Sequence, residues 1–442
     1  MIKNIILLFA ILCCVWSCDV LDVEPQNSIP ASEAFKNKND LERGILGAYN
    51  SFQSLSYYGR TYGIFADLAA DNLAHPPNAT AVAYAEVDNN AILPENTSVD
   101  GIWTAIYDGL NVVNNVITKV AGIPDMTVAE KNEAFGELYF IRALHHFNLT
   151  NYFGAIPVKT TPTVGLTNVN VPRDPVDAVY NQIITDLLFA SEYLPASSDR
   201  IRASKGAANA LLARVYLYKK DYANAVTYAT KVIDDNNYSF LPEYSDVFSS
   251  EETAESIFEI DFTALDRNRI AEYNFPLAEN GRGEVTPSAD MIDSYEFGDK
   301  RFDATYAYSG TTPYVVKYDD LSTGSENVIV LRLAEMYLIR AEAGAKLQTD
   351  ITLIWGDVNI IRNRAGLGTN NTVSYDDVLN AVEKERRHEL AFEGHRWFDL
   401  VRTGRAVDVL GTVTNINQTL FPIPLSELLT NTNPGMYQNP GY

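Results

Sequence analysis

Cysteine is almost absent from this chain of 442 residues. Its three cysteines are Cys13, Cys14 and Cys18, and none follows Cys18. A disulfide framework, a cysteine-based zinc site, an iron–sulfur cluster and a thiol nucleophile are therefore excluded from everything C-terminal to Cys18.

Positive charge is also scarce, because 34 Lys and Arg residues stand against 57 Asp and Glu residues and give a formal net charge of −23. Nucleic-acid binding needs cationic patches that displace phosphate counterions, so we expect no nucleic-acid partner. Beyond the first residues, no run approaches the ~18 uninterrupted apolar residues of a membrane span. The hydrophobic content of 46% excludes wholesale disorder.

The N-terminus has the pattern of a lipoprotein leader. A short start with one lysine precedes an apolar run from Ile5 to Trp16, which is too short to span a bilayer. Ser17 directly precedes Cys18, and Val15 lies three places before that cysteine. The sequence predicts a signal peptide over residues 1–17 and lipid attachment at Cys18. An ordinary signal peptide cut elsewhere and an uncleaved anchor are the alternatives.

Residues 18–40 form the expected acylated tether and N-terminal segment. The stretch from Asp19 to Pro30 is acidic, contains two prolines and lacks periodicity, as expected of a linker between a membrane and a folded body. We expect the folded body to span residues 41–442.

The body shows helical periodicity. The clearest example is Lys205–Asp235, where a turn at Lys220-Asp221 separates two apolar faces. Its small and aromatic residues resemble a tetratricopeptide helix pair, although the 34-residue period is not maintained. We predict a mainly α fold, an irregular tetratricopeptide-like repeat body. Further amphipathic segments are 41–55, 101–120, 129–152, 175–193, 330–347, 353–365 and 375–401, which group into helical regions at about 41–55, 101–235 and 330–402.

Three stretches rich in glycine, proline or asparagine interrupt this pattern, at about 56–100, 240–329 and 403–442. Short apolar pieces at 256–262 and 314–318 are predicted to be strands or loops. Loops carried on a rigid scaffold commonly form binding surfaces, so we expect a loop-rich, partly β binding lobe here.

Motifs for catalysis and metal binding fail on geometry. His388 and His395 are seven residues apart, roughly 10 Å along one helix, too far to share an ion at about 2.1 Å from each. A charged helix with the pairs Glu383/Arg387 and Glu393/Arg396 is favoured instead. Adjacent His145 and His146 diverge around a helix and are expected to pack. No nucleophile elbow, phosphate loop or dinucleotide fingerprint is present, so we predict no enzyme, metal or cofactor.

Tyrosine is the most suggestive residue type, since 26 tyrosines outnumber the 19 phenylalanines and 4 tryptophans together. A tyrosine offers an apolar face for a sugar ring and a hydroxyl at its edge. The predicted ligand-binding tyrosines of the loop-rich stretches are Tyr57, Tyr58, Tyr62, Tyr84, Tyr273, Tyr306 and Tyr314. The polar side chains that could bond sugar hydroxyls or peptide groups are Arg60, Asp67, Asp71, Asn72, Asn280 and Arg282.

Alternatives accompany this prediction. Each of these side chains could instead pack the loops onto the helices. Helical-repeat grooves also hold peptides, so a peptide- or protein-binding scaffold is the second hypothesis. A surface glycoside hydrolase is the third, because it needs only two well-placed carboxylates among many acidic residues.

Ordered sequence blocks resemble the SusD/RagB family of outer-membrane nutrient-binding lipoproteins. The resemblance runs from Cys18 to Tyr442, and the strongest block is Glu385–Arg402. The other blocks are Leu21–Gln26 with Ala34-Phe35 and Gly47–Tyr49, Glu137–Ala143 with Tyr152–Gly154, Leu331–Ala343, Ile361–Leu367, Pro422–Pro424 and Gln438–Tyr442.

The resemblance implies a surface-exposed lipoprotein on the outer membrane. It further implies a SusC-like TonB-dependent transporter as partner, over which the protein captures an oligosaccharide or, in some members, a peptide of the RagB type. The family blocks are structural signatures, so no ligand-contacting residue carries over from them.

Overall fold

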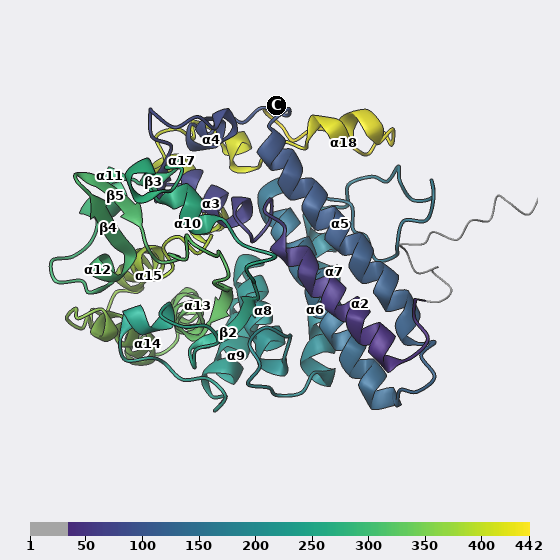
Figure 1. Ribbon diagram of the computed structural model, residues 1–442. Coiled ribbons are helices and arrows are strands. Elements are labelled where there is room, and N and C mark those ends of the chain that lie inside the picture. The colour runs from purple at the N-terminus through teal and green to yellow at the C-terminus, as the bar shows by residue number, and fades with distance from the viewer. Residues whose placement is uncertain (1–33) are drawn as a thin grey trace, which may run out of the picture.

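A computed structural model describes residues 34–442 as a helical body with a smaller lobe of short helices and strands on one side (Figure 1). The predicted leader, Cys18 and most of the tether lie outside the described residues. The body contains α2 (Lys38–Asn50), α5 (Thr97–Val120), α6 (Val128–Phe153), α7 (Val176–Tyr193), α8 (Lys205–Tyr218), α9 (Tyr222–Ile233), α13 (Leu333–Lys346), α14 (Ile351–Arg364), α15 (Tyr375–Glu389) and α16 (Arg396–Thr403).

The lobe is built from short elements. They are η1 (Ser51–Gln53), α3 (Thr61–Leu68), β1 (Leu73–Ala74), α4 (Val82–Asp88), η2 (Tyr244–Val247), α10 (Ile270–Asn274), η3 (Leu277–Glu279), β3 (Thr286–Pro287), α11 (Ala289–Asp293), α12 (Arg301–Thr305), β4 (Tyr306–Ser309) and β5 (Thr312–Val315). Strands β2 (Ser256–Ile260) and β6 (Val328–Arg332) lie where the lobe meets the body, and the C-terminal tail adds α17 (Ala406–Val409), η4 (Ile416–Thr419) and α18 (Leu425–Thr430).

The sheets are small. Each has two antiparallel strands, paired as β1 with β3, β2 with β6 and β4 with β5. The predicted mainly α fold with a partly β lobe is therefore confirmed.

Neighbouring helices pack as antiparallel pairs, as the repeat pattern predicts. Helix α8 packs on α9 after a turn in which Lys220 has a φ of 61° and Asp221 accepts from the backbone N–H of Asn224 at the start of α9. Helix α6 starts with a capping box between Thr127 and Glu130 and is buried around most of its circumference. It is the central helix of the body.

His145 and His146 have the predicted packing role. Both are fully buried in α6, and His145 Nε2 lies 3.1 Å from the Ser51 hydroxyl. A Cβ at Gly109 of α5 would approach the His145 ring to 2.8 Å, so glycine is what allows the two helices to come this close. Burial lowers the pKa of both histidines to about 3, which keeps their rings neutral.

The predicted single helix over 375–401 is wrong. Helix α15 ends at Glu389, a turn follows, and α16 begins at Arg396. Phe392 and Gly394 in the turn have φ values of 62° and 80°, which no α-helix accommodates. The sequence prediction continued the helix through this turn. The backbone N–H groups of Phe392 and Gly394 instead donate to the Asp67 side chain, which lies far away along the chain.

Other boundaries also differ from the sequence prediction. Residues 328–332 form strand β6 rather than the first turn of a helix, and the stretch 56–100 contains helices α3 and α4 as well as loops. Of the pieces predicted as strands or loops, 256–262 forms strand β2 over residues 256–260, whereas 314–318 shares only residues 314–315 with β5 and continues as a loop. The predicted pair Glu393/Arg396 does not form, because Glu393 bonds Lys317 and Arg332, whereas Arg396 bonds Asp71.

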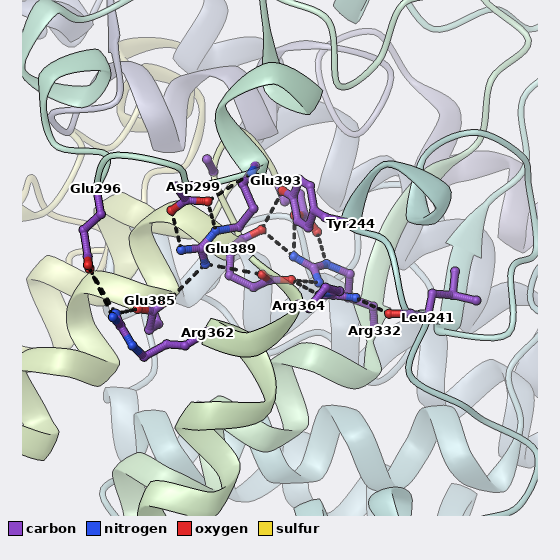
Figure 2. Close-up of polar contacts among 12 residues, drawn as sticks. Leu241, Tyr244, Glu296, Asp299, Arg332, Arg362, Arg364, Glu385, Glu389 and Glu393 are labelled. Atoms are coloured by element: carbon purple, nitrogen blue, oxygen red, sulfur yellow. Dashed lines mark hydrogen bonds and ion pairs between the residues drawn. The ribbon is translucent and has the colours of Figure 1, made fainter. Parts of the chain in front are cut away.

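A buried ionic network joins the lobe to the body (Figure 2). At its centre the Glu389 carboxylate lies 2.7 Å from Arg332 Nη1 and also bonds Arg364. Arg332 reaches Glu393 at 2.8 Å, and Glu393 in turn binds Lys317 of the lobe at 3.0 Å. The network comprises Glu255, Asp299, Arg301, Lys317, Arg332, Arg362, Arg364, Glu385, Glu389 and Glu393.

The strongest sequence block supplies three of the five acids of this network, Glu385, Glu389 and Glu393. Burial opposes ionisation of Glu389, but the surrounding guanidinium groups outweigh it and lower its pKa to about 2. The glutamates of the Glu385–Arg402 block thus have a structural role, because they form buried ion pairs with arginines from other segments.

Candidate functional site

The predicted ligand-binding residues gather in and beneath the lobe, but most of them do not reach its surface. Eight are between 0 and 9% exposed, namely Tyr57, Tyr58, Tyr62, Asp67, Asn72, Tyr84, Tyr273 and Tyr306. Five are more exposed, namely Arg60, Asp71, Asn280, Arg282 and Tyr314. A buried side chain cannot contact a ligand in this conformation, so the buried group needs a different explanation.

Three of the tyrosines close around one amide of the central helix. The Asn148 side-chain NH₂ donates to the hydroxyls of Tyr57 at 2.6 Å and Tyr58 at 2.8 Å, and the Tyr62 hydroxyl donates to its carbonyl oxygen at 2.9 Å. Burial raises the pKa of all three phenols. These tyrosines pack α3 and the segment before it onto α6, which is the packing alternative that the sequence left open.

Asp67 and Asn72 also have structural partners. Asp67 accepts from the Asn72 side chain at 2.7 Å and from the backbone N–H groups of Gly394 at 3.0 Å and Phe392 at 3.3 Å. It therefore holds the turn that separates α15 from α16. Burial raises its pKa to about 7, although these three donors oppose the shift.

Asp71 pairs with the same sequence block. Arg396 binds both of its carboxylate oxygens, at 2.6 and 2.9 Å, and Arg387 Nη2 lies 3.1 Å from Oδ2. Burial opposes ionisation of Asp71, but Arg396 and Arg387 prevail and lower its pKa. With both oxygens bonded to arginine, Asp71 has little capacity left for a ligand.

Tyr306 is a core residue of the lobe. Its ring packs in a small cluster with Met291 and Ala391, 5.7 Å from the ring of Tyr295. On the same hairpin Tyr314 is half-buried, and its ring contacts that of Phe275 at 4.8 Å.

Arginine side chains cover Tyr273. The Arg60 guanidinium lies 4.4 Å above its ring and donates to its hydroxyl at 2.7 Å, while Arg282 and Arg269 lie 5.1 and 5.9 Å from the ring centroid. Tyr84 packs beneath it at 5.6 Å. The arginine–aromatic surface is defined as Arg60, Arg269, Tyr273, Phe275, Asn280, Arg282 and Tyr314.

The polar groups of this surface are partly free. The Arg282 side chain is 44% exposed and pairs with the buried Glu284 at 3.2 Å, whereas Arg60 has no carboxylate partner within residues 34–442. A half-buried aromatic pair can stack on a sugar ring, and the arginine and amide groups beside it can donate to the ring's hydroxyls. The sequence prediction included Arg60 and Arg282 but neither Phe275 nor Arg269, because their approach to Tyr314 and Tyr273 appears only in the folded chain.

A tight turn presents the tip of this surface. The Gly283 N–H donates to the Phe275 carbonyl at 2.8 Å, so residues 275–283 fold back on themselves. Asn280 at the tip has a φ of 65°. A Cβ on Gly281 would lie 2.0 Å from the Phe275 carbonyl oxygen, a backbone atom that cannot swing away.

We therefore expect Gly281→Ala to distort this turn and to lower the free energy of unfolding by about 1–3 kcal/mol, the range typical of overpacking. Gly411 has no atom within 4 Å of a built Cβ, so Gly411→Ala is the matched control, expected to stay within about 0.5 kcal/mol. Urea unfolding of both variants measures the difference. Equal stabilities would contradict the close approach at Gly281.

The described residues offer no metal site, since no group of three or more His, Asp, Glu or Cys side chains within 34–442 could hold an ion. Across the same residues no helix has the length and apolarity to cross a membrane.

Comparison with known proteins identifies the family. A family described as "Starch-binding associating with outer membrane" matches residues 19–217, and the SusD family matches residues 299–442. The chain belongs to the SusD/RagB family. SusD-like protein P2 of Formosa agariphila is 27% identical over 96% of this chain and 97% of its own length. The starch-binding protein SusD of Bacteroides thetaiotaomicron is 25% identical over 79% of each chain.

Solved structures agree with this assignment. A laminarin-binding SusD-like protein superposes with a TM-score of 0.82 at 27% identity, covering 92% of this chain and all of that one. A SusD superfamily protein of Bacteroides thetaiotaomicron superposes with a TM-score of 0.81 at 26% identity, over 91% of this chain. This SusD-like protein therefore has a fold used for carbohydrate binding and belongs to an outer-membrane-associated, non-catalytic family.

Proposed function

We propose that this protein binds oligosaccharides at the cell surface and passes them to a SusC-like TonB-dependent transporter. The observation that carries the proposal is the 27% identity and TM-score of 0.82 to a laminarin-binding protein over nearly the whole chain. The arginine–aromatic surface is the proposed contact region. Of the predicted ligand residues it retains Arg60, Asn280, Arg282 and Tyr314 as contacts, while the buried Tyr273 supports the arginines from beneath.

Calorimetry on the mature chain tests the ligand class. We expect heat of binding with oligosaccharides prepared from laminarin or starch and none with a peptide library. The ligand should be recovered unchanged, because the protein is proposed not to be an enzyme. Binding of peptides alone would support the RagB-type alternative, and a shortened glycan would support the hydrolase.

Substitutions on the lobe test the site. Tyr314→Ala removes a half-buried stacking ring and Arg282→Ala removes a charged donor, so each is expected to weaken glycan binding about tenfold. Tyr308 is 49% exposed on the same hairpin, but its strand register places it on the face opposite Tyr314. Tyr308→Ala is therefore the matched control and should bind as the unmodified protein does. Equal affinities in all three variants would place the ligand elsewhere.

The anchor and the partner are parts of the same proposal. We propose that Cys18 carries the lipid and that the protein faces the cell exterior on the outer membrane. Cys18→Ala should release the protein from the membrane fraction and abolish incorporation of an alkyne-labelled fatty acid. The unmodified protein, solubilised from native membranes, should co-purify with a TonB-dependent barrel. Retention of the variant on the membrane, or purification without a barrel, would contradict these two parts.

A further inference from the structure

A cavity lies on the helical body, away from the arginine–aromatic surface. It has a volume of about 320 Å³, is open to solvent, and is lined by α5, the segment 157–171 and Glu427 of α18. Figure 1 shows α5 and α18 on the right-hand side of the molecule and strands β4 and β5 on the left. None of the residues that line the cavity belongs to the arginine–aromatic surface of the lobe.

Aromatic rings line one side of this cavity. The rings of Trp103 and Tyr107, on successive turns of α5, are 4.8 Å apart, and Pro157 lies beside them. Trp103 is only 3% exposed, and its Nε1–H donates to Glu427 of α18 at 3.3 Å. The Tyr107 hydroxyl donates to the Pro157 carbonyl at 3.0 Å. These bonds fix both rings. Because Trp103 is buried, it supports the wall from behind, and the half-buried Tyr107 is the ring that a ligand in the cavity would contact.

The polar side of the cavity is also held in place. The Asn114 side chain donates to the Lys159 carbonyl at 3.0 Å and accepts from Arg142 at 3.2 Å. The side-chain oxygen Oδ1 of Asn111 accepts from the Thr163 backbone N–H at 2.9 Å. The segment 157–171 is thereby fastened to α5, and the cavity is built into the fold.

Several polar groups that line the cavity are left without partners. Among residues 34–442, no hydrogen bond engages the Asp108 carboxylate, the Thr161 hydroxyl, the Asn168 carboxamide or the Asn111 side-chain NH₂. The side-chain groups without a hydrogen bond therefore include acceptors, donors and a hydroxyl, and they lie opposite the aromatic side of the cavity. A sugar ring presents the complementary combination, hydroxyl groups at its edge and C–H groups on its face.

We propose that this cavity is a second carbohydrate-binding site that takes a neutral sugar ring. Its volume is at the lower end of the range of small-molecule pockets, which suits about one or two rings rather than an extended peptide. Two carboxylates, Asp108 and Glu427, outnumber the one ammonium of Lys159 and disfavour an anionic ligand. The ligand class rests on the proposed function, but the site uses none of its residues.

The indole N–H of Trp103 provides a direct reporter. The mature chain keeps three tryptophans, and the other two do not line the cavity: Trp355 donates to the Thr372 carbonyl, and Trp397 is fully buried in α16. In a ¹⁵N-indole NMR spectrum of the mature chain, Trp103→Phe assigns the signal. We expect neutral oligosaccharides from starch or laminarin to shift the Trp103 signal saturably and to leave the other two in place.

Paired variants separate the two sites. Asp108→Ala combined with Asn111→Ala should weaken the titration of the Trp103 signal at least about tenfold, whereas Tyr314→Ala should leave it unchanged. A Trp103 signal that stays in place while calorimetry records glycan binding overturns the second site and leaves the proposed function standing. A titrating Trp103 signal with affinities insensitive to lobe variants supports the second site and contradicts the lobe site. The proposal is also overturned if only peptides shift the Trp103 signal, or if no compound shifts it.

Discussion

Glu389→Gln is expected to lower the free energy of unfolding by about 3–5 kcal/mol, the largest effect of any single substitution considered. The substitution keeps the shape of the side chain and removes its charge. Arg332 and Arg364 would then remain fully buried with one carboxylate fewer to neutralise them. Desolvated charges without a partner are costly, whereas the intact network offsets that cost through its mutual attractions.

An exposed glutamate provides the control. Glu243 pairs with Lys300 at 3.1 Å, and both side chains are more than half exposed. Glu243→Gln should cost no more than about 1 kcal/mol, because solvent screens the pair. Chemical denaturation followed by circular dichroism compares the two variants. A loss at Glu389 no larger than that at Glu243 would contradict the structural role of the network.

A charge-balanced variant keeps this prediction testable if Glu389→Gln does not fold. Adding Arg364→Met removes the one positive charge that Glu389→Gln leaves in excess, so the double variant should regain at least about 1 kcal/mol relative to Glu389→Gln. Strict additivity of the two substitutions would mean that Glu389 and Arg364 act independently, contrary to their direct contact.

Asp67→Asn is expected to abolish a pH dependence of stability worth about 3 kcal/mol between pH 4.5 and pH 8. Burial raises the pKa of Asp67 from an ordinary 3.8 to about 7 in the folded protein. Between these two values the folded protein holds a proton that the unfolded chain has released. The stabilisation is therefore present below about pH 4 and is lost as the pH rises towards 7.

The measurement compares slopes rather than absolute stabilities. Urea unfolding at several pH values should show a steeper fall with rising pH in the unmodified protein than in Asp67→Asn. Asp177 serves as the control, because its side chain is 88% exposed and Asp177→Asn should leave the slope unchanged. Parallel profiles for the Asp67 variant and the unmodified protein would show that Asp67 ionises normally.

Asp67 also illustrates why site residues were hard to recognise in the sequence. A carboxylate in a loop-rich stretch, close to tyrosines and an arginine, has the composition of a sugar site. Its partners are backbone N–H groups of Gly394 and Phe392, more than three hundred residues away along the chain. Hydrogen bonds to a distant backbone leave no trace in local composition, so the functional and structural interpretations looked alike.

The predicted tyrosines differ in exposure for the same reason. Tyr57, Tyr58 and Tyr62 share a buried amide of α6, whereas Tyr314 lies at the surface on a two-stranded hairpin. All four come from stretches rich in chain-breaking residues. Exposure depends on which element lies on top of each ring, and the sequence carries no simple record of that.

The sequence by itself determined the family, the mainly helical class and most helices of the body, because hydrophobic periodicity and ordered blocks are local or one-dimensional signals. It also predicted the leader and the anchoring cysteine, which lie outside the described residues. Only the tertiary structure decided that the charged Glu385–Arg402 block forms a buried network, that eight predicted ligand residues pack inside, and that a polar cavity with an aromatic wall lies beside α5. Each of these depends on side chains brought together from distant segments, where burial and pairing, rather than residue type, decide what a charge or a ring does.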